Sequence, residues 1–445
     1  MKIYKCIPGV ARDAGDSKGR FRRPLSLGAW LFCLILNWPL YAESEVLDLP
    51  TAQAIALAEN PGIAEMQARY ESLLEVAPQK ASLPDPVLSL GAMNFPWDEF
   101  DRNQEPMTQL QVGVSQVFPY PGKLDIREDI AFLEAEAASF AVEEGRLALA
   151  KNVAVTWWNI YYLDRAVVTV QKNLGLLRQL VDIATTKYEV GEGLQQDVLL
   201  AQLELSKALD SEIQIKAMRE QSRIRLNLLM GRPPDIAITL PGIEPTDNLS
   251  ILSEALLLER ATVSRPALAG HEATIAASES RLELAERDYY PDFKVGVTYG
   301  NRDEDDLGRS RQDFLSLMVS VNVPLYSGSK QDRAVQQRTR EVARSRYART
   351  DTLNQIRSSI AEASTEYRRA TNQLELFQGG VIPQARQTVE SMKAGYQVGK
   401  VDFLNLVRAQ ITLFNYELRY WKSVSEESQA VAALHAAVGE ENIYE

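Results

Sequence analysis

The sequence contains one unit written twice. Residues 188–191 (Tyr-Glu-Val-Gly) recur as residues 396–399 (Tyr-Gln-Val-Gly), and the Ala-Gln pair at 201–202 recurs at 409–410 with the same spacing. Other anchors recur in the same order: Asn60-Pro61 with Arg265-Pro266, Pro86 with Pro291, Gly91 with Gly296, and Pro119 with Pro324. Because the spacings agree across whole blocks, an internal repeat explains these matches better than the chance recurrence of common residues.

The repeat predicts how the chain divides. We expect a first structural repeat over residues 43–240 and a second over residues 241–445. Each has the order helix, strand, strand, very long helix, shorter helix. Four prolines lie between positions 231 and 250, where the two repeats meet, and they mark a linker.

The longest element expected in each repeat is a rod-like helix. No proline lies between Gly122 and Gly191, so this stretch, rich in Ala, Leu and Glu, predicts a helix of roughly 100 Å. Residues 328–399 predict a similar rod with a kink at Gly379-Gly380 and Pro383. A helix is also expected at the start of each repeat, over residues 51–83 and 250–289.

Both rods carry apolar residues at alternating spacings of three and four, which predicts a left-handed coiled coil. In the second rod these residues are Leu353, Ile356, Ile360, Ala363, Tyr367, Ala370, Leu374, Phe377 and Val381. In the first rod they are Val170, Leu174, Leu177, Val181, Ala184 and Tyr188.

Four short segments alternate between apolar and small or polar residues, the period of a strand with two different faces. Their apolar positions are Leu88, Leu90 and Ala92; Leu110, Val112 and Val114; Phe293, Val295, Val297 and Tyr299; and Leu315, Leu317, Val319, Val321 and Val323. Lengths near ten residues suit tilted transmembrane strands. Two amphipathic hairpins of a soluble sheet packed on the helices are the alternative.

Four strands cannot close a barrel, and open strand edges cannot face lipid, so a membrane sheet requires several copies of the chain. Two copies give eight strands and a filled interior, whereas three give twelve strands and room for a pore. The predicted fold class is an α+β membrane protein. The strand count favours three or more copies and leaves their number open.

The N-terminus has the pattern of an export signal. A basic region precedes an apolar stretch at residues 25–36, and Leu40-Tyr41-Ala42 is a suitable cleavage site, so residues 1–42 are predicted to be a signal peptide. A membrane anchor is the alternative, but the stretch is short for a span of about 20 residues. Both cysteines lie in this segment. Its removal changes the net charge from −12 by −5, to −17, which disfavours nucleic acid as a partner.

The residues after position 42 show no catalytic pattern. They include no HExxH, no glycine-rich phosphate loop and no nucleophile motif. His271 and His435 lack metal-ligand spacing and are expected on helix surfaces. We therefore predict no enzyme, no catalytic residue, no cofactor and no metal site. Met93, Met107 and Met318 are candidate soft-metal ligands, although ordinary strand and loop methionines fit the sequence better.

At this point the residues resemble the TolC family of outer-membrane efflux proteins over essentially the whole mature chain. The similar motifs are the repeated Tyr-x-x-Gly followed by Ala-Gln, the segment around Asn60-Pro61, and residues 116–123 (Gln-Val-Phe-Pro-Tyr-Pro-Gly-Lys). The resemblance implies a homotrimer in outer-membrane lipid that extends into the periplasm. It would combine a trimeric twelve-stranded outer-membrane β-barrel, four strands per chain, with a periplasmic coiled-coil barrel of α-helices. The resemblance also implies two protein partners, a periplasmic adaptor (membrane fusion) protein and an inner-membrane pump.

The same resemblance assigns roles to two helix tips. Residues expected to contact the adaptor are Val190, Gly191 and Glu192 in the first tip, and Val398, Gly399 and Lys400 in the second. Candidates for a periplasmic gate are Asp197, Asp402, Asn405 and Arg408. Asn405 stands where the family often has an acidic residue. Arg408 has two possible environments, an ion pair with Asp402 or Asp197, or solvent.

The predicted function is that of an outer-membrane exit duct in a tripartite efflux system, with heavy-metal cations as one candidate cargo. Multidrug efflux and type I protein secretion use the same architecture and stay open as alternatives. Outside the channel class, a structural coiled-coil periplasmic rod is the main alternative, but it does not explain the four alternating strands.

Overall fold

The computed structural model describes residues 46–242, 250–305, 307–440 and 442–444, so the predicted signal peptide lies outside the described residues. The first half contains α1 (Leu49–Glu59), α2 (Pro61–Leu74), α3 (Val76–Ala81), β1 (Val87–Met93), β2 (Gln109–Phe118), α4 (Lys123–Glu189) and α5 (Gln195–Leu229). The second contains α6 (Glu254–Ser264), α7 (Pro266–Arg287), β3 (Phe293–Asn301), β4 (Phe314–Val321), α8 (Gln331–Leu376), the π-helix η1 (Phe377–Val381), α9 (Ile382–Gln397) and α10 (Phe403–Val438).

The leading helices are broken, and the prediction of one continuous helix over 51–83 and another over 250–289 is wrong. The breaks at Asn60 and Arg265 have a common cause. The proline that follows each residue excludes the helical conformation there, and both are extended, with ψ of 120° and 114°. Asn60 then caps α2, because its side-chain oxygen accepts the Gly62 N–H at 2.8 Å.

Two glycines let the returning helices end against these breaks. Gly231 follows α5 with φ +69°, and an added Cβ would lie 2.5 Å from the Glu59 carbonyl oxygen. Gly439 follows α10 with φ +85°, and its Cβ would lie 3.0 Å from the Ser264 carbonyl oxygen. Only glycine suits both the left-handed conformation and the close approach. The two contacts occupy matching positions in the two predicted repeats, whose boundaries stay a prediction.

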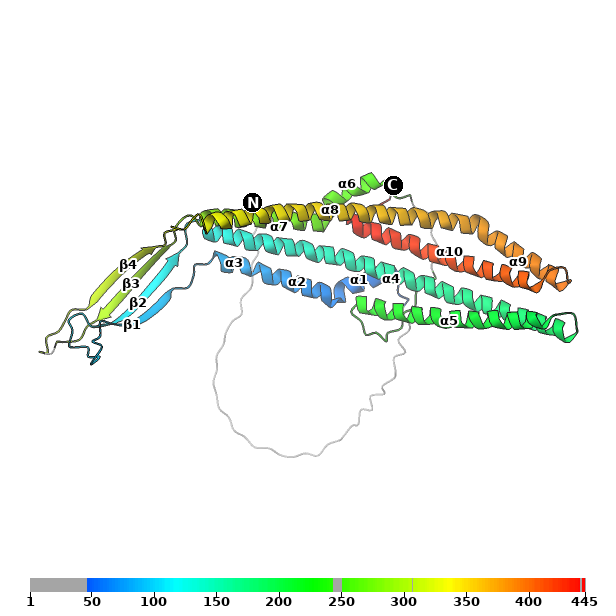
Figure 1. The fold of residues 1–445 in the computed structure, drawn as a ribbon, viewed down its shortest axis with the longest axis horizontal. Helices are drawn as coiled ribbons and strands as arrows, with labels where there is room; N and C mark the ends of the chain where they lie inside the picture. The colour runs from blue at the N-terminus through cyan, green and yellow to red at the C-terminus, as the bar shows by residue number, and fades with distance from the viewer. Residues whose placement is uncertain (1–45, 243–249, 306, 441, 445) are drawn as a thin grey trace, which may run out of the picture. The chain divides into compact units, whose positions relative to one another are not determined.

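The long helices form as expected. α4 is one helix of 67 residues, and the second rod bends at η1, which contains Gly379 and Gly380 (Figure 1). Of the nine predicted seam residues in the second rod, six are buried and three are partly buried. No helix among the described residues is sufficiently long and apolar to cross a membrane.

The core follows the helices in three clusters. One surrounds the fully buried Trp157 of α4, whose indole N–H donates to the Leu47 carbonyl at 3.0 Å. The second joins α4, α5, α9 and α10, and the third joins α6, α8 and α10. Each cluster combines elements that are distant in sequence, so packing between helices, rather than local propensity, stabilises these rods.

The four strands form an antiparallel sheet in the order β1-β2-β3-β4. Residues paired across it share a face, and the register separates the residue types. One row consists of Ser89, Gly113, Thr298 and Ser316, and the next row, on the opposite face, consists of Leu90, Val112, Tyr299 and Leu315. The sheet therefore has one apolar face and one face of small and polar residues, as the alternation predicted.

A buried lysine joins the sheet to the helices. Lys123 at the start of α4 is 2% exposed, and its ammonium lies 3.0 Å from carboxylate oxygens of both Asp288 and Asp292. Burial would raise the pKa of Asp292, but hydrogen bonds from the Tyr120 N–H and from Lys123 outweigh it, and the pKa is lowered. Tyr120 also stacks on Tyr290, with ring centroids 4.6 Å apart. The joint thus combines groups from both halves.

We expect Lys123→Met to lower the free energy of unfolding by about 3 kcal/mol, because it leaves the partly buried Asp292 without its cation. Circular dichroism of the purified protein during urea unfolding measures the change. Lys330→Met is the matched control, because Lys330 is exposed and makes no ion pair with the described residues. Equal stability of the two variants would contradict a structural role for the Lys123 ion pairs.

Candidate functional sites: the sheet and the helix tips

The apolar face of the sheet is exposed to an extent that is unusual for a soluble protein. Leu90 and Leu317 are each 77% exposed, and Val319 is 68% exposed. No described helix covers this face, so the alternative of a soluble sheet packed on helices is wrong. A continuous apolar surface of this kind needs a membrane or a protein to cover it, and the polar opposite face fits a wet channel interior.

The two helix tips share one backbone conformation. Gly191, between α4 and α5, has φ +77°, and Gly399, between α9 and α10, has φ +74°. The N–H groups of Glu192 and Lys400 each donate to a carbonyl of the preceding helix at 2.8 Å. A left-handed glycine that closes the last turn in this way ends a helix and lets the chain reverse.

An exposed valine precedes each tip glycine. Val190 is 65% exposed and Val398 is 68% exposed. Figure 1 shows the two turns at the ends of their hairpins, away from the sheet. The tips therefore present apolar side chains to solvent, which suits a contact with another protein. The adaptor contact itself stays a prediction.

The structure brings together two of the four gate candidates. Asp197 lies in the first turn of α5 and Asp402 is the N-cap of α10. Burial raises the pKa of Asp197, and the nearby Asp402 carboxylate raises it further. Asn405 and Arg408 are exposed on α10. Arg408 forms no ion pair with either aspartate among the described residues.

Sequence reasoning missed two residues of this cluster, Tyr396 and Lys187. Tyr396 is 6% exposed, and burial followed by Asp197 and Asp402 raises its pKa. The Lys187 ammonium lies 4.6 Å from the centre of its ring and donates to its carbonyl at 2.9 Å. The signal was present in the repeated Tyr-x-x-Gly motif, although its first copy, Tyr188, is 48% exposed.

The candidate metal ligands do not converge. Met93 lies in β1 and Met318 in β4, the two edge strands of the sheet, while Met107 lies in the loop between β1 and β2. The described residues contain no group of three or more His, Cys, Asp or Glu side chains suited to a metal ion. The prediction that His435 is a simple helix-surface residue is wrong, because it is partly buried and lines a cavity.

These features define a subunit of a membrane channel whose wall continues into helical hairpins. A family profile described as "Outer membrane efflux protein" matches residues 54–232 and 257–440. The chain therefore belongs to the outer membrane efflux protein family. Membership agrees with the predicted outer-membrane location and with a conduit rather than an enzyme.

Curated relatives are distant in sequence. The chain is 23% identical over 261 residues to the alkaline protease secretion protein AprF of Pseudomonas aeruginosa, covering 57% of this chain and 52% of the relative. It is 21% identical over 290 residues to the outer membrane efflux protein BepC of Brucella suis, covering 64% of this chain and 61% of the relative. The matches thus span between about half and three fifths of these relatives.

Solved structures share the fold over nearly the whole chain. The outer-membrane channel OprN superposes with a TM-score of 0.75 at 18% identity, over 88% of this chain and 89% of that one. VceC from Vibrio cholerae gives 0.74 at 20% identity, over 88% and 96%. CusC gives 0.76 at 15% identity, over 95% and 99%. These likenesses confirm the predicted combination of a four-stranded sheet with long paired helices.

The two helix tips are expected to become more stable as pH falls, because burial and the nearby Asp402 carboxylate raise the pKa of Asp197. A carboxyl whose pKa is raised by folding holds its proton more tightly in the folded protein, so its destabilising effect disappears as pH falls through that raised value. Hydrogen exchange of residues 190–200 and 396–405, corrected for intrinsic rates, should therefore be slower at about pH 4, near the ordinary pKa of an aspartate, than at about pH 7.

Asp197→Asn should remove most of this pH dependence, because the amide resembles the protonated carboxyl. Asp210→Asn, at an exposed position on α5, is the matched control and should keep it. If the Asp197→Asn protein retained the full pH effect, another group at the tip would be responsible.

Proposed function

We propose that this chain is the outer-membrane exit duct of a tripartite export system and that three copies assemble into it. The two-faced sheet with open edges at β1 and β4 carries this proposal. Three sheets of four strands give twelve strands, a number that leaves a water-filled interior. The apolar rows would face lipid and the rows of small and polar residues would line the pore.

The helices supply the periplasmic part of the duct. Four long segments per chain run beside one another, α4 with α5 and the α8–α9 rod with α10 (Figure 1). Three copies would place twelve such helices below the barrel. α5 also carries exposed apolar residues, among them Leu203, Ile213 and Leu228, and neighbouring copies would cover them. A solitary structural rod explains neither this surface nor the sheet.

The tips would meet a periplasmic adaptor protein, which joins the duct to an inner-membrane pump. Exposed Val190 and Val398 would provide the apolar contact, with Gly191, Glu192, Gly399 and Lys400 shaping the turns. The gate would close where Asp197 and Asp402 approach the buried Tyr396, with Asn405 and Arg408 on the solvent side of α10. Asn405 and Arg408 attract cations less than a ring of aspartates would.

The cargo is the finer question. Heavy-metal cations remain a proposal from the sequence, to which the structure adds only that Met93 and Met318 lie on the polar face of the sheet. The names of relatives support other cargo, since AprF is a protease secretion protein and another relative is a toxin and drug export protein of Aggregatibacter actinomycetemcomitans. Drug efflux and protein secretion therefore stand beside metal efflux.

Growth of a deletion strain on copper, silver, zinc, cobalt, dyes, detergents and antibiotics separates these cargoes. Sensitivity restored by the gene is the expected result for an efflux duct. Sensitivity to metals alone would support metal export, and sensitivity to dyes and drugs alone would exclude it. Wild-type growth on every compound would contradict efflux of these classes and leave protein secretion, tested by comparing secreted proteins.

The double variant Val190→Asp/Val398→Asp should lose about tenfold or more of the restored resistance, because buried charges weaken an apolar contact by more than 1 kcal/mol each. The trimer should persist, since the tips lie far from the sheet. Val263→Asp is the matched control at an 85% exposed valine of α6. Full resistance in the double variant would contradict the adaptor contact at the tips.

A further inference from the structure

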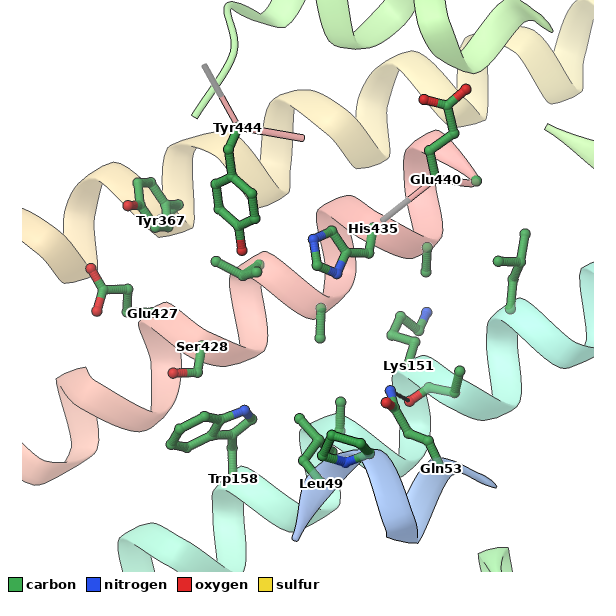
Figure 2. Close-up of a pocket in the computed structure, with 18 residues that line it drawn as sticks. Leu49, Gln53, Lys151, Trp158, Tyr367, Glu427, Ser428, His435, Glu440 and Tyr444 are labelled. Atoms are coloured by element: carbon green, nitrogen blue, oxygen red, sulfur yellow. Dashed lines mark hydrogen bonds between the residues drawn. The ribbon is translucent and has the colours of Figure 1, made fainter. Parts of the chain in front are cut away.

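A cavity lies between α1, α4, α8, α10 and the C-terminal segment, away from the sheet and the tips. Its volume is about 670 Å³, within the range of pockets that hold small organic molecules. Leu49, Ala154 and Val431 are among the apolar residues of its wall. Figure 2 shows Trp158, Tyr367 and Tyr444 around the same space, each from a different element.

One wall of this cavity carries a carboxylate without a cation. Glu427 of α10 is partly buried and accepts a hydrogen bond from the Thr371 hydroxyl at 2.8 Å. Burial raises its pKa. No lysine, arginine or histidine among the described residues forms an ion pair with it. A partly desolvated carboxylate with one neutral donor still has capacity to accept from a cation.

The aromatic residues make that end of the cavity favourable for positive charge. Burial, and after it the nearby Glu427 carboxylate, raise the pKa of the Tyr367 hydroxyl. The ring of Tyr444 packs edge-on against His435, with ring centroids 6.0 Å apart. Aromatic faces attract cations, more strongly where water is excluded. The chain already uses this interaction nearby, where the Arg165 guanidinium lies 5.1 Å from the Trp421 ring centre.

The far end of the cavity has a different character. Figure 2 shows Lys151 across the space from Glu427, with Glu440 on the same far side. A ligand with two positive ends would place one of them near the Lys151 ammonium. A ligand with one positive end and an apolar body matches both the charged end and the apolar wall.

We propose that this cavity binds a monovalent organic cation with an apolar body, whose ammonium group pairs with Glu427 beside the rings of Tyr367 and Tyr444. The ligand's body lies along Leu49, Ala154 and Val431. The site lies among α4, α8 and α10, helices of the proposed duct, but it does not depend on which cargo the duct carries.

Isothermal titration calorimetry of the detergent-solubilised mature protein with benzyltriethylammonium tests the site. We expect saturable binding of this cation near neutral pH. Benzenesulfonate, an anion with the same ring, and benzyl alcohol, a neutral analogue, should bind at least about tenfold more weakly. Absence of saturable benzyltriethylammonium binding, or equal binding of benzenesulfonate, would overturn the proposal.

Two variants locate the binding. Glu427→Gln keeps the shape and the Thr371 hydrogen bond but removes the charge. It should weaken binding of the cation roughly tenfold or more. Tyr444→Leu removes the aromatic ring and should weaken binding of the cation several-fold. Glu390→Gln, an exposed carboxylate on α9, should bind as the wild type does. Unchanged affinity in both cavity variants would show that the cation binds elsewhere and would refute the site.

Discussion

The open edges of the sheet constrain everything else in this molecule. Among the described residues, β1 and β4 each have one side without a backbone partner, and one face of the sheet is apolar. In lipid, each unpaired N–H or C=O group costs several kcal/mol, so the edges require other copies. In a meander of four strands β1 and β4 are antiparallel, and β4 of one copy can therefore pair with β1 of the next. Pairing of the sheets in a closed ring of copies also brings the helices of those copies together below the sheets.

The joint between sheet and helices determines how the helices are oriented relative to the sheet. Lys123 comes from the first half, while Asp288 and Asp292 come from the second. A buried ion pair of this kind adds little net stability over an apolar core, but it fixes one geometry because misplacement leaves charges unpaired. The joint therefore sets the angle at which α4 leaves the sheet, and the core clusters below it hold the hairpins in place.

The sequence predicts those features whose physics is local. Strand alternation, the heptad seam and the tip glycines each depend on a short pattern, and the structure has all three. The breaks at Asn60 and Arg265 also have a local cause, the proline that follows each residue. The helical pattern on both sides of each break nevertheless favoured the prediction of one continuous helix. The sequence does not predict the cluster of Asp197, Asp402 and Tyr396, because only the pairing of helices brings these positions from opposite halves together. The Glu427 cavity is hidden for the same reason, since it needs elements from both ends of the chain.

The two halves differ in their rods and in the tyrosines at their tips. The first tip ends an uninterrupted helix, α4, and its motif tyrosine, Tyr188, faces solvent. The second tip follows the π-helix at Gly379 and Gly380, where an added side chain would meet no neighbouring atom, and its tyrosine, Tyr396, is buried. A π-helix is rare, and a short π-helical turn within an α-helix often marks a functional position. The second hairpin thus combines a bend in its rod with a buried tyrosine at its tip. The first, uninterrupted hairpin supplies Lys187 and Asp197, which lie against that tyrosine.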